Sequence, residues 1–484
     1  MYYRLNKNTF FRAIDKHGYF YSQLTKHDLV TDETGCVFLS ALSRNAQSFE
    51  ALLKEVLEAF IDPPVEQVEH DLRKLLDKLV KFNYLTSGVT PEECNHNEAQ
   101  FSYAAENAKT STDIFLKDWE ATACSEDSVQ FFAETHRKTP RVHACQIEVN
   151  NLCNERCIHC YIPHQFKSKR LSKEQLFDVL EQLHEMGTLS LTLSGGEPLL
   201  HPDFIAVLRK ARELDFSINV LTNLTKMDDA ILAAFKECNV SMVQTSLYSM
   251  VPEEHDHITK LPGSQVKTKA AIERLVAAEV PVQISCPCMR TNYRSYKDVL
   301  RWAAELNCKA QTDYIMMART DFSTDNLDER LTLEETGQLI RDIMDEDVTY
   351  KGMLEEYKPS NPDEIKDDFV CGVAIDNICL AADGTYYPCS GWQGLPVGTI
   401  QQRLKDVWEN SPQLQMLRKI RKSSFPACLK CADRDFCNAC LVRNFNESGG
   451  DMFKVSKHFC QVAHLNRVCY EEHCAKLGIP VKKA

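Results

Sequence analysis

Short apolar segments alternate with amphipathic segments along the middle of the chain. The apolar segments have the length of buried strands, and the spacing of Leu176, Val179, Leu180 and Leu183 predicts a helix between two of them. Six strands are expected, at residues 145–149, 190–193, 218–222, 243–247, 282–286 and 312–316. Repeated strand–helix units predict an α/β fold with a parallel sheet and crossover helices.

The beginning of the chain has a different pattern, in which aromatic and β-branched segments precede two amphipathic helices. Strands are predicted at residues 2–14, 19–24 and 82–86, and helices at residues 49–60 and 65–80. Ser48 is a candidate N-cap for the first of these helices. A small sheet with packed helices indicates a winged-helix-like domain, one use of which is DNA binding. The first 90 residues contain 11 Lys and Arg against 12 Asp and Glu, so the domain lacks a basic face.

Polar segments divide the rest of the chain. The predicted order is a winged-helix-like domain at 1–90, a connector at 91–140, the strand–helix core at 141–330, a second connector at 331–370, a cysteine-rich module at 371–460 and a C-terminal helical tail at 461–484. Weak helices are expected near residues 114–121 and 129–134. Thr332 and Glu335 predict a capping box that opens a helix in the second connector.

Composition narrows the class of protein. The chain has 484 residues and a formal net charge of −13, which argues against a general nucleic-acid binder and against an anionic membrane surface as partner. We expect neither a signal peptide nor a membrane span, because no apolar window of about 18 residues occurs. Twenty-one cysteines without a secretion signal favour the reducing cytoplasm, where clustered cysteines bind metals.

Three cysteines follow the first predicted strand of the core at the spacing C-x3-C-x2-C. They are Cys153, Cys157 and Cys160, and the aromatic Tyr161 comes next. Three thiolates on one loop can hold three irons of a [4Fe–4S] cluster, which leaves the fourth iron open to a small molecule. Zinc is the alternative, but structural zinc sites usually pair two cysteine or histidine knuckles, which this spacing fits poorly.

A second set of cysteines lies in the cysteine-rich module. Cys371 is followed by twelve residues, Gly384, four residues and Cys389. Cys428-x2-Cys431-x5-Cys437-x2-Cys440 and then Cys460 complete the set. Zinc remains an alternative for the Cys428–Cys440 part, because its spacing also suits a zinc site.

The first cysteine motif and the residues at the following strand ends resemble the radical S-adenosylmethionine (SAM) superfamily. Ser194-Gly195-Gly196-Glu197-Pro198 follows the second strand. The resemblance implies a partial (β/α)6 barrel with its ligands at the C-terminal strand ends. It also implies that the open iron chelates SAM and that the reduced cluster cleaves SAM to a 5′-deoxyadenosyl radical.

Side chains that contact SAM also follow from this resemblance. Gly195 and Gly196 let the backbone approach the ligand, and Glu197 accepts the SAM ammonium group. Asn223 and Ser246, at the ends of the third and fourth strands, hold the ribose or carboxylate; strand-end capping is the alternative role for both. Weaker candidates for the carboxylate contact are Arg290, Asn292 and Arg319.

The second cysteine set resembles the SPASM extension of radical SAM enzymes, which carries two auxiliary [4Fe–4S] clusters. One would be held by Cys371, Cys389 and Cys440 with Cys379 as fourth ligand, and the other by Cys428, Cys431, Cys437 and Cys460. Three clusters are then expected in the chain. The family usually has three residues between the cysteines at the positions of Cys437 and Cys440, whereas this chain has two, Asn438 and Ala439.

The N-terminal domain is similar in pattern to the peptide-binding element of the PQQ peptide chaperone, which captures a leader peptide as an added strand. Together these resemblances imply a radical SAM peptide maturase that acts on a ribosomally made precursor peptide. A crosslink is the first choice of product, foremost a cysteine thioether, with carbon–carbon crosslinking close behind. The partners expected are the precursor, bound through its leader, and an electron donor such as flavodoxin or ferredoxin.

Other functions remain as alternatives. Epimerisation needs a hydrogen donor, for which Cys286 or Cys288 would serve if their strand face is the barrel lumen. Formylglycine formation ranks lower, because Ser390 stands where anaerobic sulfatase-maturing relatives have an acid. A radical SAM enzyme on a small molecule and an iron–sulfur regulator that binds DNA are the remaining two.

Overall fold

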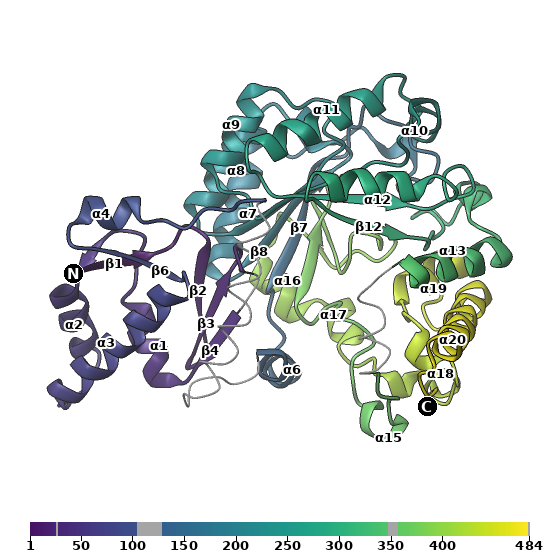
Figure 1. Cartoon of the computed structure of the whole chain (residues 1–484). Coiled ribbons are helices and arrows are strands. Elements are labelled where there is room, and N and C mark those ends of the chain that lie inside the picture. Colours follow the sequence, from purple (N-terminus) through teal and green to yellow (C-terminus); the bar gives the residue numbers. More distant parts are fainter. Residues whose placement is uncertain (26–27, 104–127, 347–356, 483–484) are drawn as a thin grey trace.

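The computed structural model of the chain describes residues 1–25, 28–103, 128–346 and 357–482. An N-terminal lobe, a central sheet with helices, and a C-terminal lobe that bears many cysteines lie side by side (Figure 1). The weak helix predicted near residues 114–121 lies outside the described residues. In the ranges that are described, no helix is both long and apolar enough to cross a membrane.

Six parallel strands form the predicted partial barrel. They are β7 (Ala144–Asn150), β8 (Ser190–Gly195), β9 (Ser217–Leu221), β10 (Met242–Ser246), β11 (Val282–Pro287) and β12 (Lys309–Asp313). Each pairs in parallel with the next one along the chain. The α/β prediction is confirmed, but the last strand ends earlier than expected. Asp313 accepts a hydrogen bond from the backbone N–H of Ile315 at 2.8 Å, and this turn ends the strand before the apolar residues that follow.

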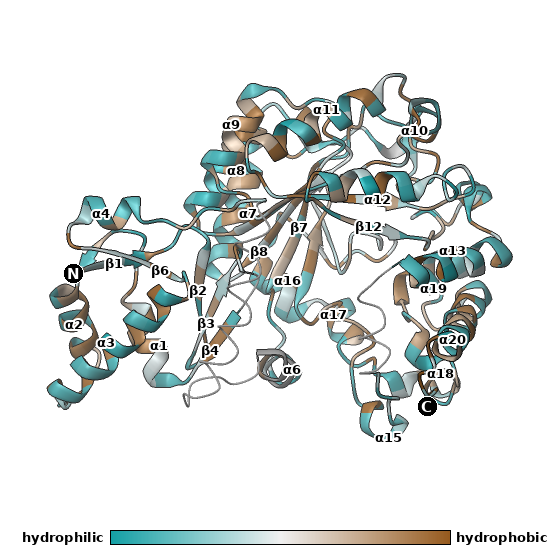
Figure 2. Ribbon diagram, in the orientation of Figure 1, coloured by the Kyte–Doolittle hydropathy of each residue, from teal (hydrophilic) through white to brown (hydrophobic). Residues whose placement is uncertain are grey.

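Helices cover the outer face of these strands. They are α7 (Lys173–Glu185), α8 (Phe204–Glu213), α9 (Asp229–Glu237), α10 (Pro252–Thr259), α11 (Ser264–Ala277) and α12 (Tyr296–Glu305). Side chains such as Leu191, Val220 and Ile284 alternate toward the helices and are fully buried in the main hydrophobic core. Figure 2 shows the matching pattern, with apolar strands inside and polar outer sides on the helices.

The cysteine-rich segment continues the same sheet. Its strands are β13 (Asn377–Leu380), β14 (Thr385–Tyr387) and β15 (Gly398–Thr399), and the sheet order is β12-β11-β10-β9-β8-β7-β13-β14-β15. β13 pairs in parallel with β7, so the segment predicted as a separate module is built onto the barrel through its first strand. A local sequence pattern does not reveal this pairing, because the two strands are far apart along the chain.

The remaining helices lie mainly in the C-terminal lobe. They are α13 (Leu333–Glu346), α15 (Pro362–Ile365), α16 (Leu404–Asn410), α17 (Pro412–Leu417), α18 (Pro426–Leu429), α19 (Leu441–Ser448) and α20 (Lys457–Leu477). The capping box at the start of α13 is confirmed by reciprocal hydrogen bonds between Thr332 and Glu335. The C-terminal helix begins before residue 461, the predicted start of the tail, and therefore includes Cys460.

The N-terminal lobe contains two three-stranded sheets where the sequence pattern indicated one. One sheet has the order β5-β1-β6 and the other β2-β3-β4. Its elements are β1 (Tyr2–Leu5), β2 (Thr9–Ile14), β3 (His17–Ser22), β4 (Asp28–Thr31), α1 (Glu33–Ser40), β5 (Gln47–Ser48), α2 (Phe49–Glu58), α3 (Val65–Lys81), β6 (Leu85–Gly88) and α4 (Pro91–His96). A turn at Asn6, which accepts from the N–H of Asn8 and Thr9, divides the predicted first strand between the sheets. Ser48 caps α2 as predicted.

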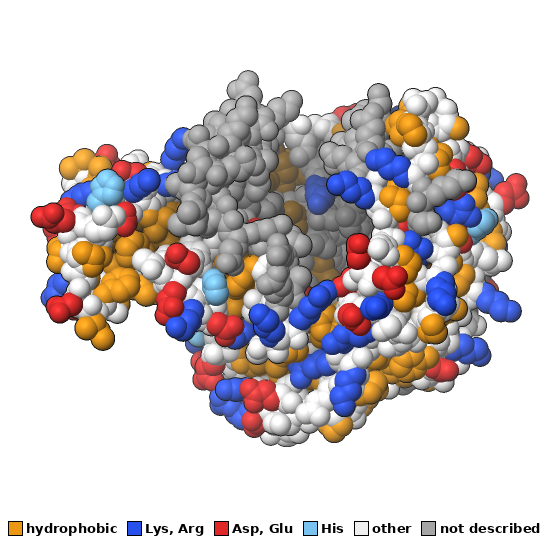
Figure 3. All heavy atoms as spheres, turned by 90° about the horizontal axis from the view of Figure 1, so that it is seen from below, with side chains coloured by type: hydrophobic (Ala, Val, Ile, Leu, Met, Phe, Trp, Pro, Cys, Tyr) orange, Lys and Arg blue, Asp and Glu red, His pale blue; other side chains and the backbone are white. Residues whose placement is uncertain are grey.

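Polar contacts and a shared apolar cluster fasten this lobe to the barrel. Arg12 donates to the carbonyl of Asp215 at 2.6 Å, and Arg44 donates to the Asp215 carboxylate at 2.6 Å. Helix α6 (Ser128–Lys138), close to the helix expected near 129–134, packs Phe131 beside Leu189 of the barrel. Figure 3 shows the lobe projecting at the left with apolar side chains on its surface, while basic and acidic side chains are interspersed over the face shown.

Candidate active site

The first cysteine loop starts directly after β7 and is fixed on two sides. On one side the backbone N–H groups of Arg156 and Ile158 donate to the carbonyls of Thr259 and Ile258 at the end of α10, at 2.9 and 3.0 Å. On the other side the Gly195–Glu197 turn contacts the start of the loop. The loop therefore lies at the carboxyl end of the first barrel strand, where the sequence predicted it.

The two glycines let the turn after β8 pack against the cysteine loop. The N–H of Gly196 donates to the carbonyl of Asn150 at 2.9 Å, and the N–H of Glu197 donates to that of Leu152 at 2.7 Å. A Cβ on Gly196 would lie 2.3 Å from the Leu152 oxygen, and one on Gly195 would lie 1.9 Å from the Asn150 oxygen. The close approach that the sequence assigned to a ligand is thus made to the cysteine loop itself.

Glu197 is fully buried, and its carboxylate has three donors. It accepts from Thr222 Oγ1 at 2.6 Å, from the N–H of Asn223 at 2.7 Å and from the N–H of Leu199 at 3.0 Å. Burial raises the pKa of Glu197 to about 7, against the lowering effect of these donors. The side chain therefore ties the end of β8 to the end of β9.

Asn223 connects the end of β9 to the cysteine loop. Its amide donates to Asn154 Oδ1 at 3.1 Å, and Asn154 in turn donates to Thr225 Oγ1 at 2.7 Å. Asn154 and Thr225 were missed in the sequence analysis. Asn154 lies between Cys153 and Cys157 in the sequence, and its polar side chain at that place was the only feature that could have pointed to it.

The three thiols of the loop are brought together. Burial, followed by the nearby Glu155 and the thiols of Cys160 and Cys153, raises the pKa of Cys157 well above its usual value. Burial also raises the pKa of Cys153 to about 11. A bound iron would remove these protons, because a coordinating thiol is deprotonated outright. The donor set fits the open [4Fe–4S] site that the spacing predicts.

Two charged side chains that the sequence analysis missed stand beside these thiols. Glu155 is 5% exposed, accepts from the Cys157 thiol at 3.4 Å, and has one oxygen without a hydrogen-bond partner in the described structure. Lys167 places its ammonium 3.4 Å from Cys160 Sγ.

Ser246, predicted as a SAM contact, lies at the end of β10, close to Tyr248. The Tyr248 hydroxyl lies 3.3 Å from His159 Nε2, in the cysteine loop. Burial, followed by Cys157 and Glu155, raises the pKa of Tyr248 well above its usual value, and the nearby Ser246 opposes this. Tyr248 and His159 therefore belong to the site, although neither was singled out from the sequence.

The weaker carboxylate candidates make other contacts. Arg290 is exposed and forms an ion pair with Glu335 at 3.7 Å, and Arg319 pairs with Asp325 at 2.9 Å. Asn292 is fully buried and donates to the carbonyl of Tyr248 at 2.7 Å, which gives it a structural role.

Cys286 and Cys288 both lie in the main hydrophobic core. Cys286 shares the face of β11 that carries Val282 and Ile284, opposite to the face of Ser285. The hydrogen-donor hypothesis required a thiol that faces the barrel lumen. Cys286 does not meet this requirement. Cys288 approaches the Thr312 hydroxyl at 2.9 Å.

Three cysteines of the C-terminal segment gather beside the barrel. Burial raises the pKa of Cys371 to about 11, and the nearby thiols of Cys440 and Cys389 contribute to this. Cys379 is 2% exposed within β13, and burial, followed by Glu148, Cys145 and Cys389, raises its pKa well above the usual value. Among Cys371, Cys389 and Cys440, only Cys389 is one of these neighbours of Cys379.

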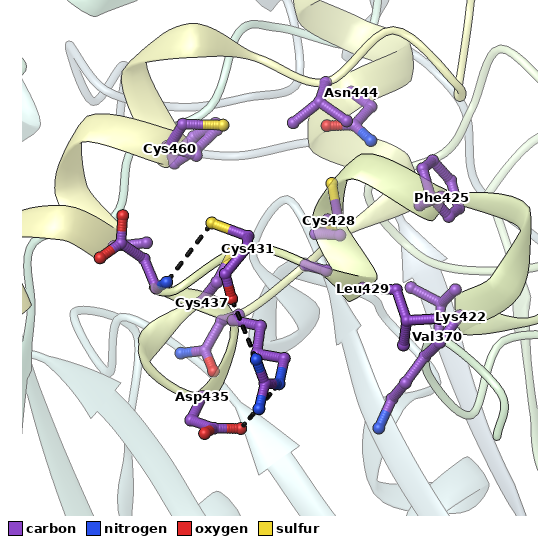
Figure 4. A pocket seen from close by; sticks show the side chains of 18 of the residues that line it. Val370, Lys422, Phe425, Cys428, Leu429, Cys431, Asp435, Cys437, Asn444 and Cys460 are labelled. Carbon is purple, nitrogen blue, oxygen red and sulfur yellow. Dashed lines mark hydrogen bonds and ion pairs between the residues drawn. The ribbon is translucent and has the colours of Figure 1, made fainter. Parts of the chain in front are cut away.

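The other four predicted ligands line one cavity of about 500 Å³, and Cys440 also lies on its wall. Figure 4 shows Cys428, Cys431, Cys437 and Cys460 around it, with Cys460 supplied by α20. The N–H of Asp433 donates to Cys431 Sγ at 3.4 Å, and Arg467 of α20 holds the Asp433 carboxylate at 2.5 Å. Four thiols around a cavity, one with a backbone donor on its sulfur, fit an iron–sulfur cluster.

Tyr161, directly after Cys160, lies near residues of the C-terminal segment. Burial, followed by Glu148, Cys379 and Cys160, raises the pKa of Tyr161 well above its usual value, and the nearby Ser390, directly after Cys389, opposes this. Glu148 of β7, which is 2% exposed, accepts from Gln393 at 3.3 Å. The site of Cys371, Cys389 and Cys440 is therefore adjacent to the first cysteine loop.

Comparisons with known proteins agree with this arrangement. A model of the radical SAM superfamily matches residues 147–317, and a model of the SPASM iron–sulfur cluster-binding domain matches residues 371–432. The AdoMet-dependent heme synthase of Methanosarcina barkeri (strain Fusaro / DSM 804) is 23% identical over 334 residues, which cover 64% of this chain and 93% of that protein. The PqqA peptide cyclase of Rhizobium meliloti (strain 1021) is 26% identical over 188 residues, which cover 38% of this chain and 50% of that protein.

Solved structures share the fold at low sequence identity. SuiB of Streptococcus suis bound to precursor peptide SuiA has a TM-score of 0.59 at 14% identity, with 94% of this chain and 99% of that chain covered. Native anSMEcpe with bound AdoMet has a TM-score of 0.54 at 17% identity, with 69% of this chain and 98% of that chain covered. The radical SAM match contains the first cysteine motif and nearly all of the barrel, and the SPASM match runs from Cys371 to just past Cys431, so the chain carries a radical SAM domain followed by a SPASM iron–sulfur domain, the domain order of a radical SAM enzyme.

Proposed function

We propose that this enzyme installs a crosslink, foremost a cysteine thioether, in a ribosomally made precursor peptide. The observation that carries the proposal is the convergence of Cys153, Cys157 and Cys160 on one loop at the carboxyl end of β7. When bound there, SAM and the reduced cluster would supply a 5′-deoxyadenosyl radical for hydrogen abstraction, and the auxiliary clusters would accept the electron left after bond formation.

The protein's own part is to hold and order these groups. We infer that Cys371, Cys389 and Cys440 hold the auxiliary cluster next to the radical site; the resemblance would add Cys379 as its fourth ligand. The second auxiliary cluster would lie in the cavity of Cys428, Cys431, Cys437 and Cys460. Cys460 is exposed, which supports electron exchange there with a donor such as flavodoxin or ferredoxin.

Two relatives support a peptide substrate. SuiB, which shares the fold over nearly the whole chain, was solved with its precursor peptide. The relatives called PqqA peptide cyclases are named for a peptide substrate. The N-terminal lobe offers a strand edge at β4, suited to capture of a leader as an added strand.

A groove between α2 and α3 gives this lobe a second surface for a leader. Its volume is about 680 Å³, and it is lined by Phe49, Leu53, Leu57, Val65 and the rim carboxylates Glu50, Glu58 and Glu69. Beside it Ile61 is fully exposed. A contiguous exposed apolar surface is typical of a binding site.

The position of Cys286 supports one product class over another. Epimerisation requires a hydrogen donor near the substrate radical, and Cys286 faces the helices. Removal of a pair of hydrogen atoms from the peptide, as in crosslinking, needs no such donor. This favours a thioether or carbon–carbon crosslink over epimerisation.

The heme synthase relatives favour a second candidate, a radical SAM reaction on a small molecule. The two candidates differ in the use of the N-terminal lobe. A leader peptide would bind the full chain through this lobe, and a small-molecule enzyme would show no such affinity.

The first test is anaerobic reconstitution of the full chain, with iron and sulfide counted and SAM and dithionite then added. About twelve irons per chain and release of 5′-deoxyadenosine are expected, and Cys157→Ala should lose about four irons and all SAM cleavage. Intact clusters without SAM cleavage would contradict a radical SAM reaction.

The second test takes as substrate any short peptide found to be encoded beside the gene. Mass spectrometry should find a product lighter by a pair of hydrogen atoms and, for a thioether, one cysteine thiol fewer for alkylation. Leu53→Glu should weaken binding of the labelled leader to the full chain if the groove holds it. Ala51→Glu adds the same charge at an exposed position of the same helix that does not line the groove, and is the control. Unmodified peptide in the presence of active SAM cleavage would favour the small-molecule candidate.

A further inference from the structure

The segment after the cysteine loop folds back onto the end of β7 and is held rigidly. The N–H of Lys167 donates to the carbonyl of His164 at 3.2 Å, which closes a short helical turn. Two residues later the backbone of Lys169 exchanges hydrogen bonds with Asn151, at 3.0 Å with its N–H and at 2.6 Å with its side-chain oxygen. The N–H of Leu171 then donates to the carbonyl of Val149 at 3.1 Å.

This anchoring aims the ammonium group of Lys167 at the first cysteine loop. Its Nζ lies 3.4 Å from Cys160 Sγ, and the side chain is half-buried. Within the described part of the chain Lys167 forms no ion pair with a carboxylate, so its charge is not neutralised by a direct partner. The neighbouring Lys169 belongs to the same loop but is exposed.

The other close contacts of the predicted ligand thiols differ from this one. Cys157 lies beside the carboxylate of Glu155 at 3.4 Å, and Cys431 accepts a backbone N–H. Among the side-chain hydrogen bonds given for the described cysteines of the three sites, Lys167 supplies the one cationic donor. At the second auxiliary site burial raises the pKa of Cys437 to about 11, and the guanidinium of Arg443 opposes this. Lys167 stands at the loop where a cluster must be reduced before the radical reaction begins.

A fixed cation beside a cluster ligand changes the energy of the two oxidation states unequally. Reduction adds one electron to the cluster and forms or breaks no bond, so the reduced state carries one more negative charge. An ammonium at short range in a half-buried site stabilises that state more than the oxidised one, which raises the reduction potential. The buried carboxylates of Glu155 and Glu197 act in the opposite direction.

We propose that Lys167 is a positioning residue that acts through Cys160 to raise the reduction potential of the cluster held by Cys153, Cys157 and Cys160. This inference rests on the proposed function, since it requires a cluster on that loop. It assigns to the chain itself, rather than to the external donor alone, part of the control over when the radical reaction can start.

The test is an anaerobic redox titration of the reconstituted full chain with dithionite, followed by electron paramagnetic resonance. The cluster of interest is the one whose signal changes when SAM is added. Lys167→Met should shift its one-electron reduction equilibrium at least about tenfold toward the oxidised state, which corresponds to a potential lower by about 59 mV. Lys167→Arg, which keeps the charge, and Lys169→Met, the matched control in the same loop, should both stay within about threefold of the wild type.

The possible outcomes separate the two proposals. A Lys167→Met potential equal to that of the wild type would overturn the inference, and so would a Lys167→Arg shift as large as that of Lys167→Met. A wild-type chain with no SAM-responsive signal would overturn the proposed function and the inference with it. Lys167→Gln tests the same loss of charge should Lys167→Met fail to hold a SAM-responsive cluster.

Discussion

The hydroxyl of Thr222 donates a 2.6 Å hydrogen bond to the fully buried carboxylate of Glu197. This contact links the turn after β8, which packs against the cysteine loop, to the end of β9. Because Glu197 cannot reach water, the loss of a donor leaves part of its carboxylate unsatisfied.

Thr222→Val removes this donor with little change in volume. We expect the free energy of unfolding of the metal-free chain to fall by about 1–3 kcal/mol, as for other buried groups that lose a hydrogen bond. Denaturant unfolding under anaerobic conditions measures the change. Thr245→Val in β10 is the matched control, because Thr245 is buried and its hydroxyl has no hydrogen-bond partner among the described residues. Equal losses for the two variants would contradict a special role for the Thr222–Glu197 bond.

Gly196→Ala should displace the cysteine loop. The added Cβ would meet backbone oxygens of Leu152 and Asn151 at 2.3 and 2.5 Å, and neither atom can move without shifting Cys153. The expected result is a loss of about four irons and of SAM cleavage, with the auxiliary irons retained. Iron analysis and 5′-deoxyadenosine release measure both effects.

The control for that variant is Gly187→Ala. Gly187 has φ of 74°, and a Cβ there would meet no atom within 4 Å. Its alanine variant should cost about 1 kcal/mol of backbone strain and keep its iron. Full iron content in Gly196→Ala would show that the loop tolerates the displacement.

Low pH should destabilise the barrel through His255. The ring is 1% exposed, and its Nδ1 accepts the N–H of Tyr248 at 3.2 Å, which requires the neutral form. Burial lowers the pKa of His255 from 6.5 to about 4. Between these pH values the unfolded chain binds a proton that the folded chain does not, so the free energy of unfolding decreases as the pH falls, by at most about 3 kcal/mol from this residue.

His255→Gln should flatten this pH dependence, because the glutamine cannot take up the proton. Denaturant unfolding at a series of pH values from 6.5 to 4 compares its slope with that of the wild type. His70→Gln, on the exposed side of α3, is the control and should keep the wild-type slope. A slope unchanged in His255→Gln would mean that other buried groups carry the effect.

Cys379→Ser should keep the iron content of the wild type. Cys379 is buried in β13 next to Glu148 and Cys145, and of the three gathered thiols of Cys371, Cys389 and Cys440 only that of Cys389 is near it. Cys371→Ala, in contrast, should lose about four irons. If Cys379→Ser loses as many as Cys371→Ala, then Cys379 is the fourth ligand that the family resemblance implies.

Several features could be predicted from the sequence because they depend on neighbouring residues. The helical period of α2 and α3, the capping box at Thr332 and the alternation of strand and helix segments all arise from interactions within a few positions or a single turn. The spacing of Cys153, Cys157 and Cys160 is likewise local, because one loop carries all three thiols. For such features the residue pattern is itself the physical cause.

Other features were decided only by the tertiary structure. The pairing of β13 with β7, the saturation of Glu197 by Thr222 and Asn223, and the approach of Lys167 to Cys160 each join groups whose distance depends on how the whole chain folds. The same holds for Cys379, which the family resemblance adds to the predicted ligands and which β13 brings near both Glu148 and Cys389. A one-dimensional pattern gives the chemistry of each residue and its local conformation, whereas the packing of distant segments determines which of these groups meet.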